Sequence, residues 1–282
     1  MSVFHNNVLA GAAGQAGGDA APGSTRSLRF NSADSAYLSR ADSNSNQKTV
    51  TFSFWIKKLG QQFEWPTIYS STLDSNNGFT IRWNVDRLQL YVLTGGSYGV
   101  QLTPDRKFRD YSGWLHVVAV VDTTASTESD RAKFYFNGVE HTSGFDFTTE
   151  YPSQDESLKI NVSGQTINIG RRHYSSSQYI DAYLADFYFI DGQALDPTSF
   201  GAFDDNGVWQ AAAYSGTYGT NGFHLAFGDS TSSAALGTDS SGNNNTFTVH
   251  NISGDAVGLS TANQGFGILK YCLLYTSDAA DE

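Results

Sequence analysis

Several aromatic residues fall in loops or at strand ends of this 282-residue chain, where their rings would be open to a ligand. An exposed aromatic face stacks against the C–H groups of a sugar ring, while nearby amides and carboxylates bind its hydroxyls. These residue types predict a shallow carbohydrate-binding groove. For each aromatic, packing within the protein is the alternative. The candidates are Trp65, Trp83, Tyr98, Tyr174, Tyr179 and Trp209.

Three acidic, Asn-containing loops are candidates for a calcium site. This cation prefers oxygen ligands from Asp, Asn and backbone carbonyls. The alternative in each loop is an Asx turn, in which the carboxylate accepts hydrogen bonds from its own backbone. The six histidines show no ligand-like spacing, so zinc is not expected. The candidate loops contain Asp74, Asn76 and Asn77; Asp204, Asp205 and Asn206; and Asp239 with Asn243.

Two other motifs favour structural roles. "GGSYG" places Ser97 where a hydrolase of the G-x-S-x-G type has its nucleophile, but that motif needs a helix after it. Here a second strand-like segment follows, which predicts a hairpin turn. His116 shares one strand face with Val118 and Val120, which predicts a buried, hydrogen-bonded ring.

The charge of the chain excludes some partners. Its formal net charge is -11 and its pI is about 4.8. An acidic surface repels phosphate backbones and anionic lipids, so we expect no nucleic-acid binding. No apolar run approaches the roughly 20 residues of a membrane helix, and the first residues lack a recognisable secretory signal. We therefore expect no membrane insertion.

The elements that would position these residues are strands. In "TVTFSFWIK", Val50, Phe52, Phe54 and Ile56 fall on one face, and similar alternation recurs between turns along the chain. The pair Asn137-Gly138 is typical of a two-residue hairpin turn. The pattern predicts an all-β fold, a two-sheet antiparallel β-sandwich of the jelly-roll type.

Four segments carry a family resemblance: "SLRFNSADSAYLSR", "TVTFSFWIK", "GWLHVVAVVD" with "AKFYFNGV", and "INIGRRHYSSSQYIDAYLADFYFIDGQALDPTSFG". In this order they resemble the laminin-G-like jelly rolls of the concanavalin A-like lectin and glucanase superfamily. Glucanases of that superfamily commonly carry Glu-x-Asp-x-x-Glu on one strand, and this chain has no such run. Because retaining glycosidases need two carboxylates about 5 Å apart, we predict no enzyme activity.

The resemblance also divides the chain. Residues 1–26 form an Ala/Gly-rich arm, 27–201 the jelly roll, 202–253 an extension and 254–271 a linker. The extension either completes the first sandwich or begins a second one, and we favour completion. The last segment, 272–282, contains the single cysteine and resembles translated sequencing adapter.

We predict a non-enzymatic, lectin-like module that binds a glycan or cell-surface polysaccharide. The start "FHNNVLAGAAGQ" resembles jelly-roll proteins of environmental phage, which points to a tail-fibre or other structural protein on a virion, or to an extracellular location. The first alternative is a structural domain that decorates a virion or contacts other virion subunits. The second is a glycoside hydrolase.

Overall fold

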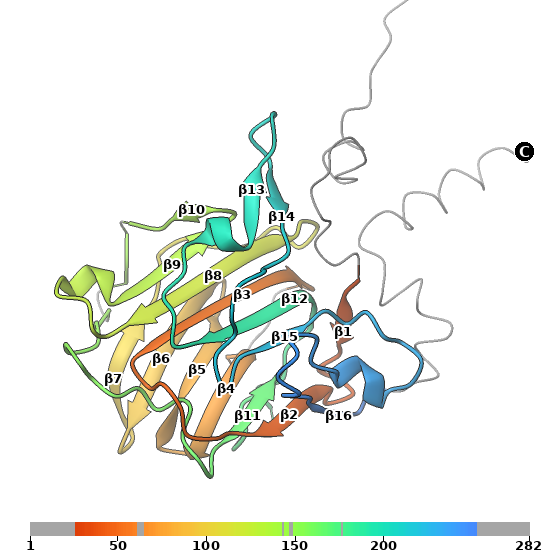
Figure 1. Cartoon of the computed structure of the whole chain (residues 1–282), viewed down its shortest axis with the longest axis horizontal. Helices are drawn as coiled ribbons and strands as arrows, with labels where there is room; N and C mark the ends of the chain where they lie inside the picture. The colour runs from red at the N-terminus through yellow and green to blue at the C-terminus, as the bar shows by residue number, and fades with distance from the viewer. Residues whose placement is uncertain (1–25, 61–64, 143, 147–148, 176, 253–282) are drawn as a thin grey trace, which may run out of the picture.

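The computed structural model describes residues 26–60, 65–142, 144–146, 149–175 and 177–252. Two antiparallel sheets pack face to face in these residues (Figure 1). This arrangement confirms the predicted β-sandwich.

Sheet I has β12 and β3 at its centre. The strand order is β1-β12-β3-β8-β9-β10, and β15 pairs with β12 farther along the edge that β1 also uses. The strands are β1 (Leu28–Phe30), β3 (Thr49–Lys58), β8 (Leu115–Asp122), β9 (Ala132–Phe136), β10 (Val139–Glu140), β12 (Ala182–Asp191) and β15 (Phe223–Leu225).

Sheet II has the order β16-β2-β11-β4-β5-β6-β7. Three successive hairpins form its β4 to β7 half, and the Gly95-Gly96 turn joins β6 to Ser97 at the start of β7, as the sequence predicted. The strands are β2 (Tyr37–Ala41), β4 (Thr67–Asp74), β5 (Asn77–Asn84), β6 (Arg87–Thr94), β7 (Ser97–Leu102), β11 (Thr166–Ile169) and β16 (Thr248–His250).

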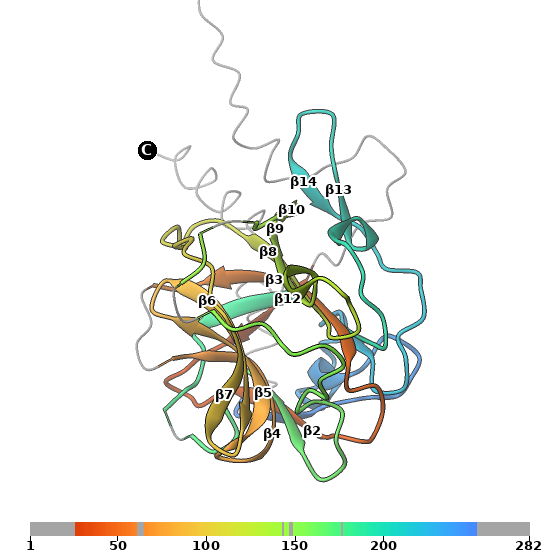
Figure 2. The same ribbon diagram turned by 90° about the vertical axis from the view of Figure 1, so that its left-hand side faces the viewer.

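A separate two-stranded hairpin projects from one end of the sandwich (Figures 1 and 2). Helical structure within the described residues is limited to single 3₁₀ turns. Asp196 caps one of them by accepting a hydrogen bond from Thr198 N–H, with Pro197 in the first position. These elements are β13 (Gly201–Phe203), β14 (Trp209–Ala211), η1 (Glu128–Asp130), η2 (Pro197–Ser199) and η3 (Ala234–Gly237).

The main core lies between the two sheets and is rich in aromatic rings. The Phe52 ring of β3 lies 4.7 Å from that of Tyr69 and 5.5 Å from that of Phe79, both on sheet II. Val50, Phe52, Phe54 and Ile56 are all buried there, which confirms the predicted inward face of β3. Alternate residues of each strand must therefore point away from this core.

A smaller apolar cluster covers the other face of sheet I. Val118 and Val120 of β8 and Tyr188 and Ile190 of β12 pack there against Phe200, which follows η2. Sheet I therefore packs against apolar side chains on both of its faces. The outer face of sheet II has no comparable apolar cluster among the described residues.

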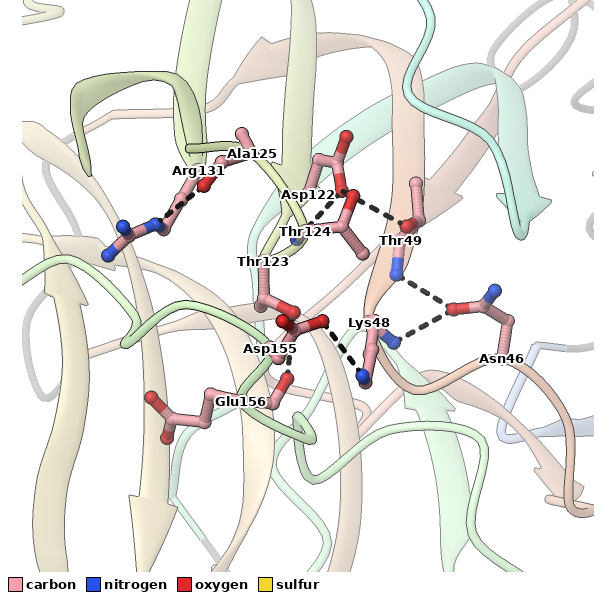
Figure 3. Close-up of polar contacts among 10 residues, drawn as sticks. All are labelled: Asn46, Lys48, Thr49, Asp122, Thr123, Thr124, Ala125, Arg131, Asp155 and Glu156. Atoms are coloured by element: carbon pink, nitrogen blue, oxygen red, sulfur yellow. Dashed lines mark hydrogen bonds and ion pairs between the residues drawn. The ribbon is translucent and has the colours of Figure 1, made fainter. Parts of the chain in front are cut away.

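Side chains at the end of the sandwich fix the loops that enter β3 and leave β8. The side-chain amide oxygen of Asn46 accepts hydrogen bonds from the N–H groups of Lys48 and Thr49, both at 2.8 Å (Figure 3). Asp122 accepts from the Thr49 hydroxyl at 3.2 Å and from Thr124 N–H at 3.0 Å. The first residues of β3 and the last of β8 are therefore held in register.

The segment after the hairpin supplies one strand to each sheet. Phe223 pairs with Phe189 in sheet I, and Val249 pairs with Leu38 in sheet II. Phe247 is buried beside Phe223, with ring centroids 4.8 Å apart. The main core therefore includes side chains from 202–253.

Candidate functional site

The outer face of sheet II carries an unusual set of side chains for a strand surface. On β5, Ile81 and Trp83 point into the core, so Thr80 and Arg82 point outward. Thr80 and Arg82 are nevertheless buried, and the rings of Tyr91 and Trp65 lie against the Arg82 guanidinium. Polar and aromatic side chains on this face therefore pack against one another and are partly buried.

Arg82 is the centre of a first cluster on β5, β6 and β7. Its Nε donates to the side-chain amide oxygen of Gln89 at 2.7 Å, and Nη2 donates to the Tyr98 hydroxyl at 3.4 Å. Its guanidinium lies 4.3 Å from the centroid of the Tyr91 ring and 5.2 Å from that of Trp65. The cation is thus stacked between two aromatic rings and bonded to neutral oxygens. We call these five residues the Arg82 station.

Arg171, just after β11, is the centre of a second cluster. Its Nε donates to the side-chain amide oxygen of Asn168 at 3.1 Å, and Nη1 lies 3.5 Å from the Tyr179 hydroxyl. The guanidinium lies 3.6 Å from the Tyr37 ring centroid, and His250 stacks on that ring at 4.1 Å. Burial, and then the Arg171 charge, lower the pKa of His250, so this ring is neutral at pH 7. We call these residues the Arg171 station.

The two stations have the same construction. In each, an arginine bonds through Nε to a side-chain amide, reaches a tyrosine hydroxyl through one Nη, and lies over a second tyrosine ring. Neither Arg82 nor Arg171 forms an ion pair with a carboxylate of the described residues. Both cations are therefore held by neutral groups.

The stations lie at the same level of the sheet on either side of β4. Thr67 of β4 pairs with Arg82, and Gly170 N–H donates to the Ile68 carbonyl on the other edge of β4. Two inter-strand steps separate β11 from β5, so the two arginine backbones are roughly 10 Å apart.

The segment 171–175 lies along β4 between the stations. The Arg171 carbonyl accepts from the Ser70 hydroxyl at 3.1 Å, and the Tyr174 hydroxyl donates to the Leu73 carbonyl at 2.5 Å. Polar atoms beneath and within this part of the face are buried without a hydrogen-bond partner among the described residues. They are Thr72 Oγ1, Tyr91 OH, Arg172 Nε, His173 Nδ1 and Gln178 Oε1.

Four of the six aromatic candidates lie at the outer face of sheet II or on the loop beside it. Trp65 is 49% exposed and Tyr98 45% exposed, and both belong to the Arg82 station. Tyr179 belongs to the Arg171 station, while Tyr174, 52% exposed, stands beside the end of β4. Their rings offer half-open faces next to fixed hydrogen-bonding groups.

Trp83 and Trp209 lie elsewhere and are corrected to packing residues. Trp83 alternates inward with Ile81 and is 1% exposed in the main core. Trp209 covers the outer side of sheet I, where its Nε1 donates to His116 Nδ1 at 2.9 Å. His116 is 1% exposed and also lies 2.9 Å from the Ser53 hydroxyl, which confirms its predicted buried, hydrogen-bonded ring.

The candidate calcium loops all form Asx-type turns in the structure. Asp74 accepts from Asn76 N–H at 2.7 Å and from the Asn77 amide, and these bonds lower the pKa of its carboxyl. Asp204 accepts from the N–H groups of Asn206 and Val208, and Asp205 follows it in the same turn.

The third loop is similar, because Asp239 accepts from the N–H groups of His224, Ser241 and Asn245. The part of the chain that the structure describes contains no group of three or more His, Cys, Asp or Glu residues placed to hold a metal. Calcium at these loops remains a prediction from the sequence.

Arg82 and Arg171 were not among the residues predicted from the sequence. Alternation could have found Arg82, Gln89 and Tyr91, since each is flanked by inward apolar residues in "TIRWN" and "LQLYVL". No local pattern could have found Arg171, because its partners come from β2, β11 and β16 and meet only in the folded sheet.

Residues 30–199, more than half of the chain, match the family model Laminin_G_3, described as "Concanavalin A-like lectin/glucanases superfamily". No curated protein sequence matches the chain.

Three solved structures are similar to this chain. A heptameric SAP-like pentraxin from Limulus polyphemus is 17% identical, covers 61% of this chain and 78% of its own, and has a TM-score of 0.44. Domains LG4-5 of the mouse laminin α1 chain are 15% identical, with 75% and 50% covered and a TM-score of 0.43. Domain 4 of AbnA, an extracellular GH43 arabinanase of Geobacillus stearothermophilus solved with arabinotriose, is 16% identical, with 57% and 68% covered and a TM-score of 0.40.

Proposed function

The chain belongs to the concanavalin A-like lectin/glucanases superfamily, and from this premise we propose that it is a non-enzymatic, carbohydrate-binding module. The observation that carries the proposal is the outer face of sheet II. Half-exposed Trp65 and Tyr98 provide rings for sugar faces, and fixed amides and guanidinium groups stand beside them. This is the combination that a saccharide needs for stacking and for hydrogen bonds to its hydroxyls.

The chemistry of the stations supports binding over hydrolysis. A retaining glycosidase needs two carboxylates about 5 Å apart, one of them a proton donor. The functional groups of the Arg82 and Arg171 stations are guanidinium, amide, phenol, indole and imidazole. None of the station residues can act as a carboxylate nucleophile or acid.

A glycan array tests this function. Purified protein is expected to bind one class of glycan, and Trp65→Ala and Tyr98→Ala should each weaken that binding by about tenfold, the equivalent of about 1.4 kcal/mol for a lost ring contact. Phe203→Ala is the matched control, because Phe203 is 52% exposed on the projecting hairpin, away from sheet II.

The other outcomes point to the alternatives. Binding to no sugar, together with a stable oligomer in solution, would contradict the proposal and favour a structural domain on a virion. Release of reducing sugar would instead indicate a hydrolase. Repeating the array with a calcium chelator tests the calcium prediction, since a calcium-dependent site would lose binding.

We also propose display on a virion or another extracellular surface. Support comes from the resemblance of the N-terminal sequence to phage jelly-roll proteins. The described residues include no helix long and apolar enough to cross a membrane. Tail or capsid genes beside this gene on a longer contig would support the virion, and their absence from that neighbourhood would contradict it.

A further inference from the structure

Resting on the proposed function, we infer that the glycan is acidic and that two of its anionic groups bind Arg82 and Arg171. The shared chemistry is an oxyanion on a saccharide, either the carboxylate of a uronic acid or a sulfate ester. Both present oxygens that match the fork of N–H donors on a guanidinium.

Arg82 has no counter-charge among the described residues. It is buried, at 6% exposure, and the groups of these residues that bond to it are neutral. Lys58, also strongly buried, lies 3.3 Å from the Asp86 carboxylate. Buried charges are normally paired in this way, because removing a charge from water is costly. An anion on the ligand would give Arg82 the counter-charge that Asp86 gives Lys58.

Contacts within the protein hold the Arg82 side chain in place without a ligand. Thr103 accepts a hydrogen bond from the Gln89 amide nitrogen at 2.9 Å, which turns the Gln89 oxygen toward Arg82 Nε. Tyr91 and Trp65 fix the plane of the guanidinium. Its Nη1 has no hydrogen-bond partner among the described residues, so donors remain for an oxyanion, and ordering costs are low.

The contacts around Arg82 are repeated around Arg171 on the same face. The Arg171 station repeats the amide, tyrosine and stacked-ring contacts of the Arg82 station about 10 Å away across β4. Two such stations on one face suit one chain that carries two anionic groups. A short saccharide with a single acidic group would reach only one of them.

The net charge of the chain does not favour acidic glycans, so any preference for them must come from the two arginine sites. At a formal net charge of -11, the protein has no general attraction for polyanions. Asp74 and Glu150 lie at the margins of sheet II, where Asp74 caps the β4–β5 turn and the Glu150 backbone pairs with Gln101. Binding must therefore come from direct contact with the two arginines.

The test compares acidic and neutral oligosaccharides on the full chain. A panel of uronate-containing, sulfated and neutral hexasaccharides is titrated by calorimetry. Only acidic members should bind tightly, and Arg82→Gln and Arg171→Gln should each weaken them by about 10- to 100-fold, the usual effect of losing a charged hydrogen bond. Methyl esterification should abolish binding if the group is a carboxylate, and desulfation should do so if it is a sulfate ester.

Arg106→Gln is the matched control. Arg106 also lies over aromatic rings, Phe108 and Phe136, but it stands outside both stations, so its loss removes the same charge without the contact. Acidic disaccharides should be affected by only one of the two station variants. Thermal unfolding of each variant shows whether it remains folded.

Tight binding to neutral hexasaccharides that is unchanged in Arg82→Gln and Arg171→Gln would overturn the acidic glycan and leave the lectin function standing. An equal loss in Arg106→Gln would also overturn it, because the effect would then be one of net charge. Binding to no saccharide at all would overturn the proposed function and this inference together.

Discussion

His116 lies on the outer side of sheet I between a hydroxyl and an indole. The Trp209 indole can only donate, so His116 Nδ1 must be the acceptor, and Nε2 carries the hydrogen that is donated to Ser53. A second proton on Nδ1 would oppose the indole N–H. Burial accordingly lowers the pKa of His116 from 6.5 to about 3.

This imidazole predicts a pH dependence of stability. The unfolded chain binds a proton at His116 below about pH 6.5, while the folded chain resists it until about pH 3. The free energy of unfolding is therefore unaffected by His116 above pH 6.5 and falls by up to about 1.4 kcal/mol per pH unit below it. Urea unfolding of the native chain and of His116→Gln between pH 4 and 7.5 isolates this effect.

The difference between the two proteins should grow in favour of the native chain as pH rises from 4 to 6.5, and then stay constant. Asp and Glu residues contribute equally to both proteins, so they cancel. A difference that does not vary with pH would show that His116 takes up its proton equally in both states.

The surroundings of individual residues were only partly predictable from the sequence. Alternation was enough to place His116 and Phe52 inside the protein. The interaction of His116 with Trp209 joins residues 93 positions apart, and nothing near either residue in the sequence indicates it. The Arg171 station was missed for the same reason, since no part of the chain contains more than a few of its members.

At the scale of elements, the β9–β10 turn supports the projecting hairpin. Asn137 and Gly138 both have positive φ, 49° and 79°, which confirms the predicted two-residue turn. The Asn137 side chain accepts from His116 N–H at 2.8 Å. Gly138 lies directly against the Trp209 ring, so the hairpin packs on a position that has no room for a side chain.

Gly138→Ala should destabilise the protein for two reasons. Alanine in the left-handed region costs about 1–2 kcal/mol, and its Cβ would lie 2.2 Å from Trp209 Cε3. Gly164→Ala is the control, because Gly164 has φ of 88° with no atom within 4 Å of a new Cβ. Urea unfolding should show a clearly larger loss for Gly138→Ala. Equal losses would mean that the indole moves aside without cost.

Elements were predicted more reliably than the faces of individual residues. The strands of "TVTFSFWIK" and "WLHVVAVVD" match β3 and β8, because their apolar alternation is strong. Trp83 was assigned to a binding groove from its position near a strand end, although its alternation with Ile81 indicates the core. The segment 171–175 has no periodicity in the sequence, so its course over β4 was not predictable.

At the scale of the whole molecule, the sandwich extends beyond the residues that match the family. The family match ends at residue 199, whereas β15 and β16 lie after residue 220 and pair with β12 and β2. His250 of β16 also stacks on Tyr37 in the Arg171 station. The same extension therefore contributes to the core and to the proposed glycan surface.

We predict that a chain ending at Gly201 does not fold. The truncation removes Phe223, which packs on Phe187 and Phe189 at 6.0 and 5.6 Å, together with Leu225 and Phe247 of the main core. Loss of one such buried phenylalanine costs about 3–5 kcal/mol, and a domain of this kind is stable by only about 5–15 kcal/mol. Circular dichroism should show no cooperative unfolding of the truncated chain, while Phe223→Ala should still fold with a lower midpoint in urea. A truncated chain that unfolds cooperatively at the midpoint of the full chain would contradict this account, because 202–253 would then be a separate unit.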